Sequence, residues 1–171
     1  EIERRILGNK FCENFNNCFL IFKFCKIAKI SDLHLKLINK ILMEMDDIVV
    51  SFDGQDFLLT LLPLLNESQK NEILLKIIKI APKLMRIEHN SDFIINLAEI
   101  SKNGQKDKLF NKIVKNMEES FYYPHFRTNF IKYIKSIEMS EKNIKNLHNE
   151  MKELYIFYCY NDKLNSLIIV F

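Results

Sequence analysis

The sequence predicts an all-α fold, specifically a right-handed α-solenoid of about five stacked helical hairpins of 36–38 residues. Only 3 Gly and 3 Pro occur among 171 residues, whereas β-sandwiches, barrels and propellers need many tight turns. Apolar residues recur at i, i+3, i+4 and i+7, and no useful length of chain alternates with the period of two typical of a strand. A short segment also recurs five times at nearly constant spacing, which indicates tandem repeats.

The recurring segment contains two small or polar residues followed by two or three apolar residues. Its fifth residue is Phe19, Phe57, Phe93, Phe130 or Leu167, and successive copies are 38, 36, 37 and 37 residues apart. These intervals predict one helical-repeat domain over residues 1–171, with units at approximately 1–31, 32–67, 68–104, 105–140 and 141–171. Each unit is expected to form two helices, and the recurring segment belongs to the second.

An amphipathic helix is predicted upstream of each of the last four segments, because apolar residues there share one helical face. These apolar stripes are Leu35, Leu37, Ile38, Ile41, Leu42 and Met45; Ile73, Leu74, Ile77, Ile78 and Leu84; Leu109, Ile113, Val114 and Met117; and Ile144, Leu147, Met151 and Leu154. Polar clusters at Asn66–Ser68, Ser101–Gly104 and Ser140–Asn143 separate the units and are expected to cap the helices that follow. Pro82 and Pro124 precede the second helices, where proline ends or starts a helix.

The last residues, from Leu167 to Phe171, are apolar and stop inside a predicted helix. Terminal repeats normally present a polar outer face. We therefore expect this chain to be part of a longer protein whose further repeats cover this end, or a protein partner to cover it.

Charge and cysteine content point to no specific partner by themselves. Lys and Arg number 25 against 22 Asp and Glu, and a net charge of +3 does not indicate nucleic-acid binding. The four cysteines, Cys12, Cys18, Cys25 and Cys159, form no C-x-x-C pair and are expected to be buried free thiols. No apolar run reaches the ~18 residues of a membrane span. We expect an intracellular protein in a reducing compartment, the cytoplasm or the nucleus or nucleolus, without a membrane partner.

The sequence offers no arrangement typical of an enzyme. Gly8, Gly54 and Gly104 are too far apart for a phosphate-binding loop. The adjacent carboxylates Asp46–Asp47 and Glu118–Glu119 diverge by about 100° on a helix, so they do not converge on one reacting atom. We predict no catalytic residue, no metal site and no cofactor.

The segment Gly54-Gln55-Asp56-Phe57-Leu58 carries the closest resemblance to a known family. It places a Gly, two polar residues and an apolar pair in the order that begins the second long helix of the Pumilio (PUF) repeat. Asn90-Ser91-Asp92-Phe93-Ile94 follows the same order, with Asn in place of the Gly. On these motifs residues 10–171 resemble a divergent Pumilio protein. The HEAT or armadillo repeat, which Leu61–Asn66 resembles at a helix end, is the second choice.

The Pumilio resemblance implies RNA binding along a concave face. The residues that it places there are Asn17, Gln55, Asp56, Ser91, Asp92, Thr128, Asn129, Lys132, Asn165 and Ser166. Base-specific reading is not expected, because the second base-edge position is aliphatic in four of the five units, at Ile21, Leu59, Ile95 and Ile169. The stacking positions, Cys18, Asp56, Asp92, Asn129 and Ser166, likewise include no aromatic residue or Arg. We therefore expect a scaffold that holds RNA or a ribonucleoprotein by shape and charge, or alternatively a HEAT-type protein-interaction scaffold.

Two further groups of residues have both a functional and a structural interpretation. Lys106, Lys112, Arg127 and Lys135, with the nearby Tyr122, Tyr123 and Tyr133, are candidates for phosphate contacts and base stacking. The alternative is an ordinary solvated lysine face. Phe19, Phe22 and Phe24 suggest either a ligand pocket or the core of the first unit.

Overall fold

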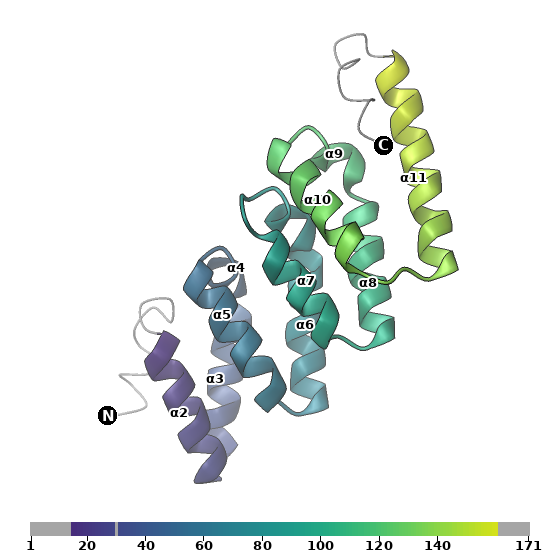
Figure 1. Cartoon of the computed structure of the whole chain (residues 1–171). Helices are drawn as coiled ribbons and strands as arrows, with labels where there is room; N and C mark the ends of the chain where they lie inside the picture. Colours follow the sequence, from purple (N-terminus) through teal and green to yellow (C-terminus); the bar gives the residue numbers. More distant parts are fainter. Residues whose placement is uncertain (1–14, 30, 161–171) are drawn as a thin grey trace. The chain divides into compact units, whose positions relative to one another are not determined.

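The computed structural model describes residues 15–29 and 31–160, and every regular element in these residues is helical (Figure 1). The predicted all-α class is therefore confirmed. The elements are α2 (Phe15–Ile27), α3 (Ser31–Met43), α4 (Met45–Ile48), α5 (Phe52–Leu61), the 3₁₀ helix η2 (Leu62–Leu64), α6 (Glu67–Leu84), α7 (Ser91–Ile100), α8 (Asn103–Val114), α9 (Met117–Ser120), α10 (Pro124–Ser136) and α11 (Glu141–Tyr160).

The chain divides into two compact units, Glu1–Ile80 and Ala81–Phe171, and the boundary falls within α6. In the first unit α2 packs against both α3 and α5 (Figure 1). In the second unit α7 packs against α8 and α10, and α8 packs against α11. Within each unit, a helix therefore lies beside the corresponding helix of the next hairpin as well as beside a sequence neighbour.

The predicted capping clusters begin two of the helices. The side chain of Asn66 accepts a hydrogen bond from the Gln69 N–H at 2.9 Å, and Gln69 Oε1 accepts from the Asn66 N–H at 3.4 Å. Ser140 Oγ accepts from the Asn143 N–H at 3.3 Å before α11. These bonds satisfy backbone donors that the first helical turn leaves unpaired. At α8 the Gln105 side chain performs this task, accepting from the Lys102 N–H at 3.2 Å.

The two prolines behave differently from each other. Pro124 is the first residue of α10, as predicted, where its missing N–H costs no helical hydrogen bond. Pro82 lies inside α6, whose helical conformation continues to Leu84. The expectation that Pro82 ends the preceding helix is therefore wrong. Because proline has no N–H, the helix lacks the hydrogen bond from residue 82 to the Ile78 carbonyl, and it ends two residues later at Leu84.

The buried positions recur with an interval of 36 residues along the described chain. The stretches 37–62, 73–98 and 109–134 begin 36 residues apart and share almost every buried position. Phe57, Phe93 and Asn129 correspond in this register, so Phe130 corresponds to Leu58 and Ile94. The sequence alignment of Phe130 with Phe93 is thus displaced by one residue, because it matched the two aromatic side chains instead of the buried positions.

The apolar stripes form the core, with local exceptions. The stripe residues predicted on α6 and in the α8–α9 segment are all buried. Leu35 and Ile144 lie at exposed positions, with 54% and 52% of their surfaces accessible. Phe22 is buried, whereas Phe24 is 60% exposed, so the aromatic cluster of α2 is only partly core. Cys18 and Cys25 are buried and are not in a disulfide, as expected, whereas the side chains of Cys12 and Cys159 lie outside the described residues.

Side-chain hydrogen bonds connect successive hairpins within each unit. In the first unit, the ammonium of Lys76 donates to the Leu42 carbonyl, 34 residues away. In the second unit, Asn143 Nδ2 donates to Asp107 Oδ1 at 2.7 Å across 36 residues. Asn146 Nδ2 donates to Asn111 Oδ1 at 2.6 Å across 35 residues. Each of these bonds spans about one interval of the burial pattern.

Candidate interaction surfaces

A side chain early in the second helix of a hairpin binds a carbonyl of the loop before it. Gln55 Nε2 donates to the Val49 carbonyl at 2.7 Å, six residues back in the chain. Arg127 Nη1 donates to the Phe121 carbonyl at 2.8 Å, also six residues back. The two bonds occupy the same register position in different hairpins, since both donor and acceptor are displaced by two 36-residue intervals. Gln and Arg therefore perform the same structural task.

In the hairpin that lies between these two in the sequence, a side chain from a different helix binds the loop carbonyls. The corresponding residue of that hairpin is Ser91, which is buried and too short to act as Gln55 does. The loop carbonyls of Met85 and Ile87 instead accept from Asn129 Nδ2 of α10, at 3.0 and 2.7 Å. Asn129 is itself buried, with 4% of its surface exposed. An unpaired buried carbonyl is costly, so this bond stabilises the α7–α10 contact.

These bonds determine what the predicted RNA-facing residues offer to a ligand. Gln55, Ser91 and Asn129 are buried, and the amide donors of Gln55 and Asn129 bind the protein backbone. Arg127, a predicted phosphate contact, donates to its own loop. Four residues of the predicted set are exposed to solvent: Asp56, Asp92, Thr128 and Lys132. The side chain of Asn17, together with Asn165 and Ser166, lies outside the described residues.

The charged side chains of α5 and α7 are all acidic. The sequences of both helices contain no Lys, Arg or His. In the first unit Asp53 and Asp56 of α5 are exposed. In the second unit Asp92 and Glu99 of α7 are exposed. Each helix thus presents negative charge, which repels the phosphates of a nucleic acid and attracts basic groups.

One basic residue of α10, Lys132, is paired with a carboxylate of α7 in the second unit. The Lys132 ammonium lies 2.8 Å from Asp92 Oδ1, and both side chains remain more than half exposed. Lys135 is exposed near the end of the same helix. Thr128 donates through its hydroxyl to the Pro124 carbonyl at 3.4 Å. The α7–α10 surface therefore mixes charges of both signs.

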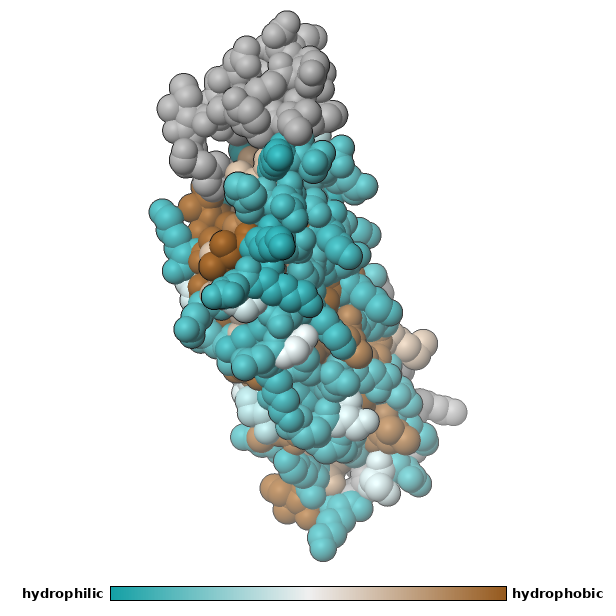
Figure 2. Space-filling model, turned by 90° about the vertical axis from the view of Figure 1, so that its right-hand side faces the viewer, coloured by the Kyte–Doolittle hydropathy of each residue, from teal (hydrophilic) through white to brown (hydrophobic). Residues whose placement is uncertain are grey.

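The other predicted phosphate contacts lie on α8. Lys106 and Lys112 are half-buried, while Lys108 and Lys115, the residue that follows α8, are exposed. Figure 2 shows that hydrophilic residues cover most of the surface visible in that view, and that hydrophobic residues form separate patches. The structure thus separates the predicted phosphate contacts into a pair on α8 and a pair on α10.

The three tyrosines considered as stacking platforms have different environments. Tyr122 and Tyr123 are exposed at 49% and 45%, and the Arg86 guanidinium lies 4.7 Å from the Tyr123 ring centre. Arg86 also donates to Ser120 Oγ from Nε at 3.1 Å and from Nη2 at 2.9 Å. Tyr133 is buried, and this burial strongly raises the pKa of its hydroxyl. A buried ring cannot stack on a base without a change of structure.

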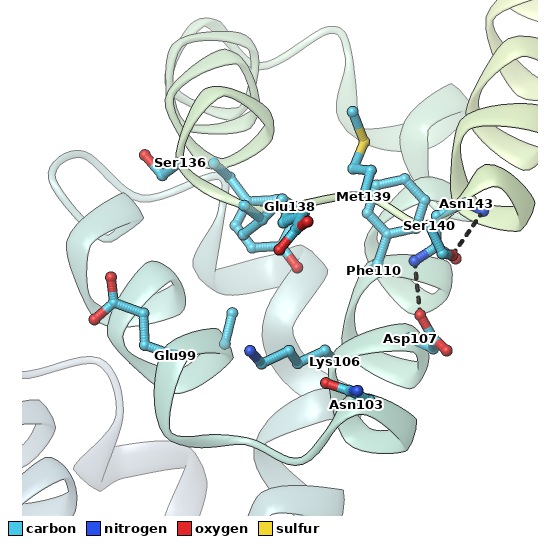
Figure 3. Close-up of a pocket in the computed structure, with 13 residues that line it drawn as sticks. Glu99, Asn103, Lys106, Asp107, Phe110, Ser136, Glu138, Met139, Ser140 and Asn143 are labelled. Atoms are coloured by element: carbon cyan, nitrogen blue, oxygen red, sulfur yellow. Dashed lines mark hydrogen bonds between the residues drawn. The ribbon is translucent and has the colours of Figure 1, made fainter.

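A pocket of about 510 Å³ opens in the second unit where α7, α8, the α10–α11 connection and the start of α11 meet. Figure 3 shows polar and charged side chains around it, including Glu99, Lys106, Asp107, Glu138 and Asn143. Its apolar lining consists of Ala98, Phe110, Tyr133, Ile137 and Met139. Of these lining residues, the sequence predicts a phosphate contact at Lys106 and a stacking platform at Tyr133.

A pocket of about 390 Å³ in the first unit includes Cys25 and His34 among its lining residues. The Phe22 and His34 rings lie 4.4 Å apart between their centres. Burial, and secondarily the charge of Lys26, lowers the pKa of His34, while burial raises the pKa of the Cys25 thiol. Both shifts disfavour the charged form, as expected for residues packed into a helical junction. A reactive thiolate would need the opposite shift.

Neither a metal site nor a membrane span is found in residues 15–29 and 31–160. No group of three or more His, Cys, Asp or Glu side chains there is arranged to hold a metal ion. Within the same residues, no helix combines the length and the apolar character that crossing a bilayer requires.

Comparison with known proteins returned no match: no family model, no curated protein and no solved structure is significantly similar to this chain.

Proposed function

We propose that this chain is a non-enzymatic helical-repeat scaffold that binds protein, and that the acidic helices α5 and α7, each by itself, receive basic groups of the partner. The observation that carries the proposal is the charge of α5 and α7, each taken by itself. Asp53 and Asp56 on α5 and Glu99 on α7 are exposed, and neither helix contributes a basic side chain. Asp92 on α7 is also exposed, but it is paired with Lys132 of α10. Such surfaces steer basic partners and repel polyanions.

The positions of the polar groups also favour protein over RNA. Base recognition by helical repeats needs side-chain donors and acceptors that point outward, together with planar groups that stack. In the described hairpins the amide groups of Gln55 and Asn129 donate hydrogen bonds to loop carbonyls. The outward residues at the adjacent positions are the carboxylates Asp56 and Asp92. A nonspecific RNA surface would in turn need concentrated basic charge, which these helices lack.

An α-solenoid is the arrangement that would make such surfaces available. Three features support it: the 36-residue recurrence of buried positions, the packing of corresponding helices within each unit, and the hydrogen bonds of Lys76, Asn143 and Asn146 to the preceding hairpin. A repeat that contacts only its neighbours leaves a row of helices free for a partner. About five units remain the number predicted from the sequence.

Fluorescence anisotropy with two labelled probes tests this function. One probe is a peptide of alternating Lys and Ser, and the other is an RNA hairpin with a single-stranded tail. We expect the chain to bind the peptide and to bind the RNA weakly at physiological salt. D53N/D56N should weaken peptide binding about tenfold, since two charge contacts of somewhat under 1 kcal/mol each are lost.

A matched control removes the same charge elsewhere in the same unit. D46N/D47N neutralises two exposed carboxylates of α4 and should leave peptide affinity within about twofold. Equal losses in both double variants would show that only net charge matters and would contradict the proposed surface. RNA that binds more tightly than the peptide, with affinity falling steeply between ~50 and ~200 mM salt, would favour RNA binding instead.

A further inference from the structure

The first unit exposes an apolar stripe along α2, formed by Leu20, Phe24 and Ile27. These side chains are 63%, 60% and 83% exposed. Their spacing of i, i+4 and i+7 places them on one face of the helix. Phe22 and Cys25, on the opposite face, are buried in the unit. Large apolar side chains gathered on an exposed helical face are typical of a docking surface, whereas single ones are common on any protein.

The face that carries the α2 stripe is exposed to solvent in the next three hairpins. Phe22 and Cys25 are buried, as are Leu58 and Leu61 of α5, which follow them by 36 residues. In this register the three stripe positions are again exposed, and they hold Asp56, Thr60 and Pro63; Asp92, Asn96 and Glu99; and Thr128, Lys132 and Lys135. None of those residues is a large apolar one. A further hairpin packed like these would therefore leave the stripe exposed, so a different kind of partner is needed to bury it.

The carboxylates of α5 lie beside this stripe. Helices α2 and α5 pack against each other (Figure 1). In the second unit two positions of neighbouring helices are in contact, since Lys132 Nζ lies 2.8 Å from Asp92 Oδ1. The register assigns the same two positions to Thr60 and Leu20 in the first unit, and Asp56 is one turn from Thr60 on α5. An acidic edge therefore borders the apolar stripe.

Lys23 lies next to the stripe on α2. It is exposed, and its ammonium is 4.6 Å from the Phe19 ring centre of the same helix. Its charge opposes basic groups, so the basic residues of a partner are confined to the neighbourhood of Asp53 and Asp56. The occupant that satisfies both parts of the surface is an amphipathic helix, with apolar residues at i, i+4 and i+7 and basic residues along one flank.

We propose that the α2 stripe, together with Asp53 and Asp56 of α5, docks an amphipathic helix of the protein partner. The apolar face of that helix buries Leu20, Phe24 and Ile27, and its basic residues pair with the two carboxylates. This inference rests on the proposed protein-binding function and specifies it, because the segment that the first unit receives is helical and carries apolar anchors besides its basic groups.

Fluorescence anisotropy of the full chain with two labelled peptides tests the docking site. The first is a helix of Leu, Lys and Ala, with leucines at i, i+4, i+7 and i+11 and lysines along one flank. The second has the same composition in an order that disperses the leucines around the helix. We expect the first peptide to bind at least tenfold more tightly. L20N/F24T, which places polar residues on the stripe as in the other hairpins, should weaken its binding about tenfold, because two apolar contacts are lost.

Further variants separate docking from a loss of structure. M43S/V50S removes two exposed apolar side chains of the same unit outside the stripe and should leave the affinity within about twofold. K23Q removes the cation that opposes the lysines and should strengthen binding about threefold, the opposite direction from L20N/F24T. L20N/F24T should leave binding of the alternating Lys and Ser peptide unchanged, since the carboxylates of α5 remain, whereas D53N/D56N should weaken binding of both peptides.

Four outcomes would overturn the docking site. Two of them are equal binding of the two peptide orders and equal losses in L20N/F24T and M43S/V50S. The third is self-association of the chain in sedimentation velocity that L20N/F24T abolishes, which would assign the stripe to a second copy. The fourth is displacement of the helical peptide by vesicles that contain phosphatidylserine, which would assign the stripe to a lipid surface.

The proposed function is judged separately from the docking site. After any of those four outcomes, weaker binding of the Lys and Ser peptide by D53N/D56N would still support an acidic α5 surface. Conversely, no effect of D53N/D56N on either peptide would overturn the proposed function, together with the basic flank assigned to the docked helix.

Discussion

The buried amide of Asn129 shows how a single side chain connects two helices. It donates to two carbonyls of the loop before α7, those of Met85 and Ile87. Both acceptors belong to the hairpin that precedes α10, and Ser91 at the corresponding position of that hairpin is too short to serve them. Removal of Asn129 would therefore leave polar backbone groups in a packed interior, where each lost partner carries a desolvation cost.

Asn129→Ala should lower the free energy of unfolding by about 2–3 kcal/mol, because two buried carbonyls lose their donor. Urea denaturation followed by far-UV circular dichroism measures this change. Thr128→Ala is the neighbouring control and should change stability by less than about 0.5 kcal/mol, since Thr128 is exposed. A similar small effect of both variants would contradict the structural role assigned to Asn129.

At the scale of the helix, α5 begins in close contact with the end of α4. Ser51 Oγ accepts from the Gly54 N–H at 3.1 Å and donates to the Ile48 carbonyl at 3.2 Å. A Cβ atom at Gly54 would lie 2.0 Å from that carbonyl oxygen, which is backbone and cannot rotate away. Gly54 is therefore required by the close approach of two helices. Its place in the Pumilio-like motif has this local steric reason in the present chain.

Gly54→Ala should destabilise the protein by about 2 kcal/mol or more, because the α4–α5 turn must shift to admit the methyl group. Gly104→Ala is the matched control, since a Cβ atom at Gly104 meets no heavy atom within 4 Å. That substitution should be neutral or stabilising by up to about 1 kcal/mol, through the better helix propensity of Ala. Thermal or urea unfolding of the two variants side by side checks the difference, and equal effects would contradict it.

At the scale of the whole molecule, the interval of 36 residues relates the corresponding positions of successive hairpins. The buried positions of α3, α6 and α8 are related in this way, as are those of α5, α7 and α10. The interval therefore makes successive hairpins exchangeable in principle.

Deletion of residues 73–108, which joins Glu72 to Leu109, removes one interval and should leave a helical protein that unfolds cooperatively. Deletion of residues 73–106 removes two residues fewer and rotates the downstream apolar stripe by about 200°. This control should lose cooperative unfolding and expose apolar surface. Circular dichroism and dye binding distinguish the two, and identical behaviour of both deletions would contradict a tandem repeat.

The sequence was sufficient to predict elements whose signal is carried by side-chain spacing. The all-α class, the buried stripes of α6 and α8, the caps at Asn66 and Ser140, and Pro124 at the start of α10 are confirmed. The position of Pro82 inside α6 and the register of Phe130 were not predicted correctly, because local residue types mislead where tertiary packing decides.

The candidate sites were harder to predict because their essential atoms are not visible in a sequence. Gln55 and Arg127 bind backbone carbonyls, and no residue type marks an acceptor of that kind. The large pocket of the second unit also requires the connection between α10 and α11 to fold over α8. The acidic character of α5 and α7, in contrast, follows from the sequence once the exposed positions are known.

The loop carbonyls bound by Gln55, Asn129 and Arg127 also bear on how such a repeat can evolve. The acceptor in each case is a main-chain oxygen, which no point mutation can delete. Amides and a guanidinium all serve as donors, and one of them comes from the following hairpin. Lineages of this repeat can therefore exchange these residues while keeping the same architecture, so ancestry within the array is better traced by the phase of burial than by residue identity.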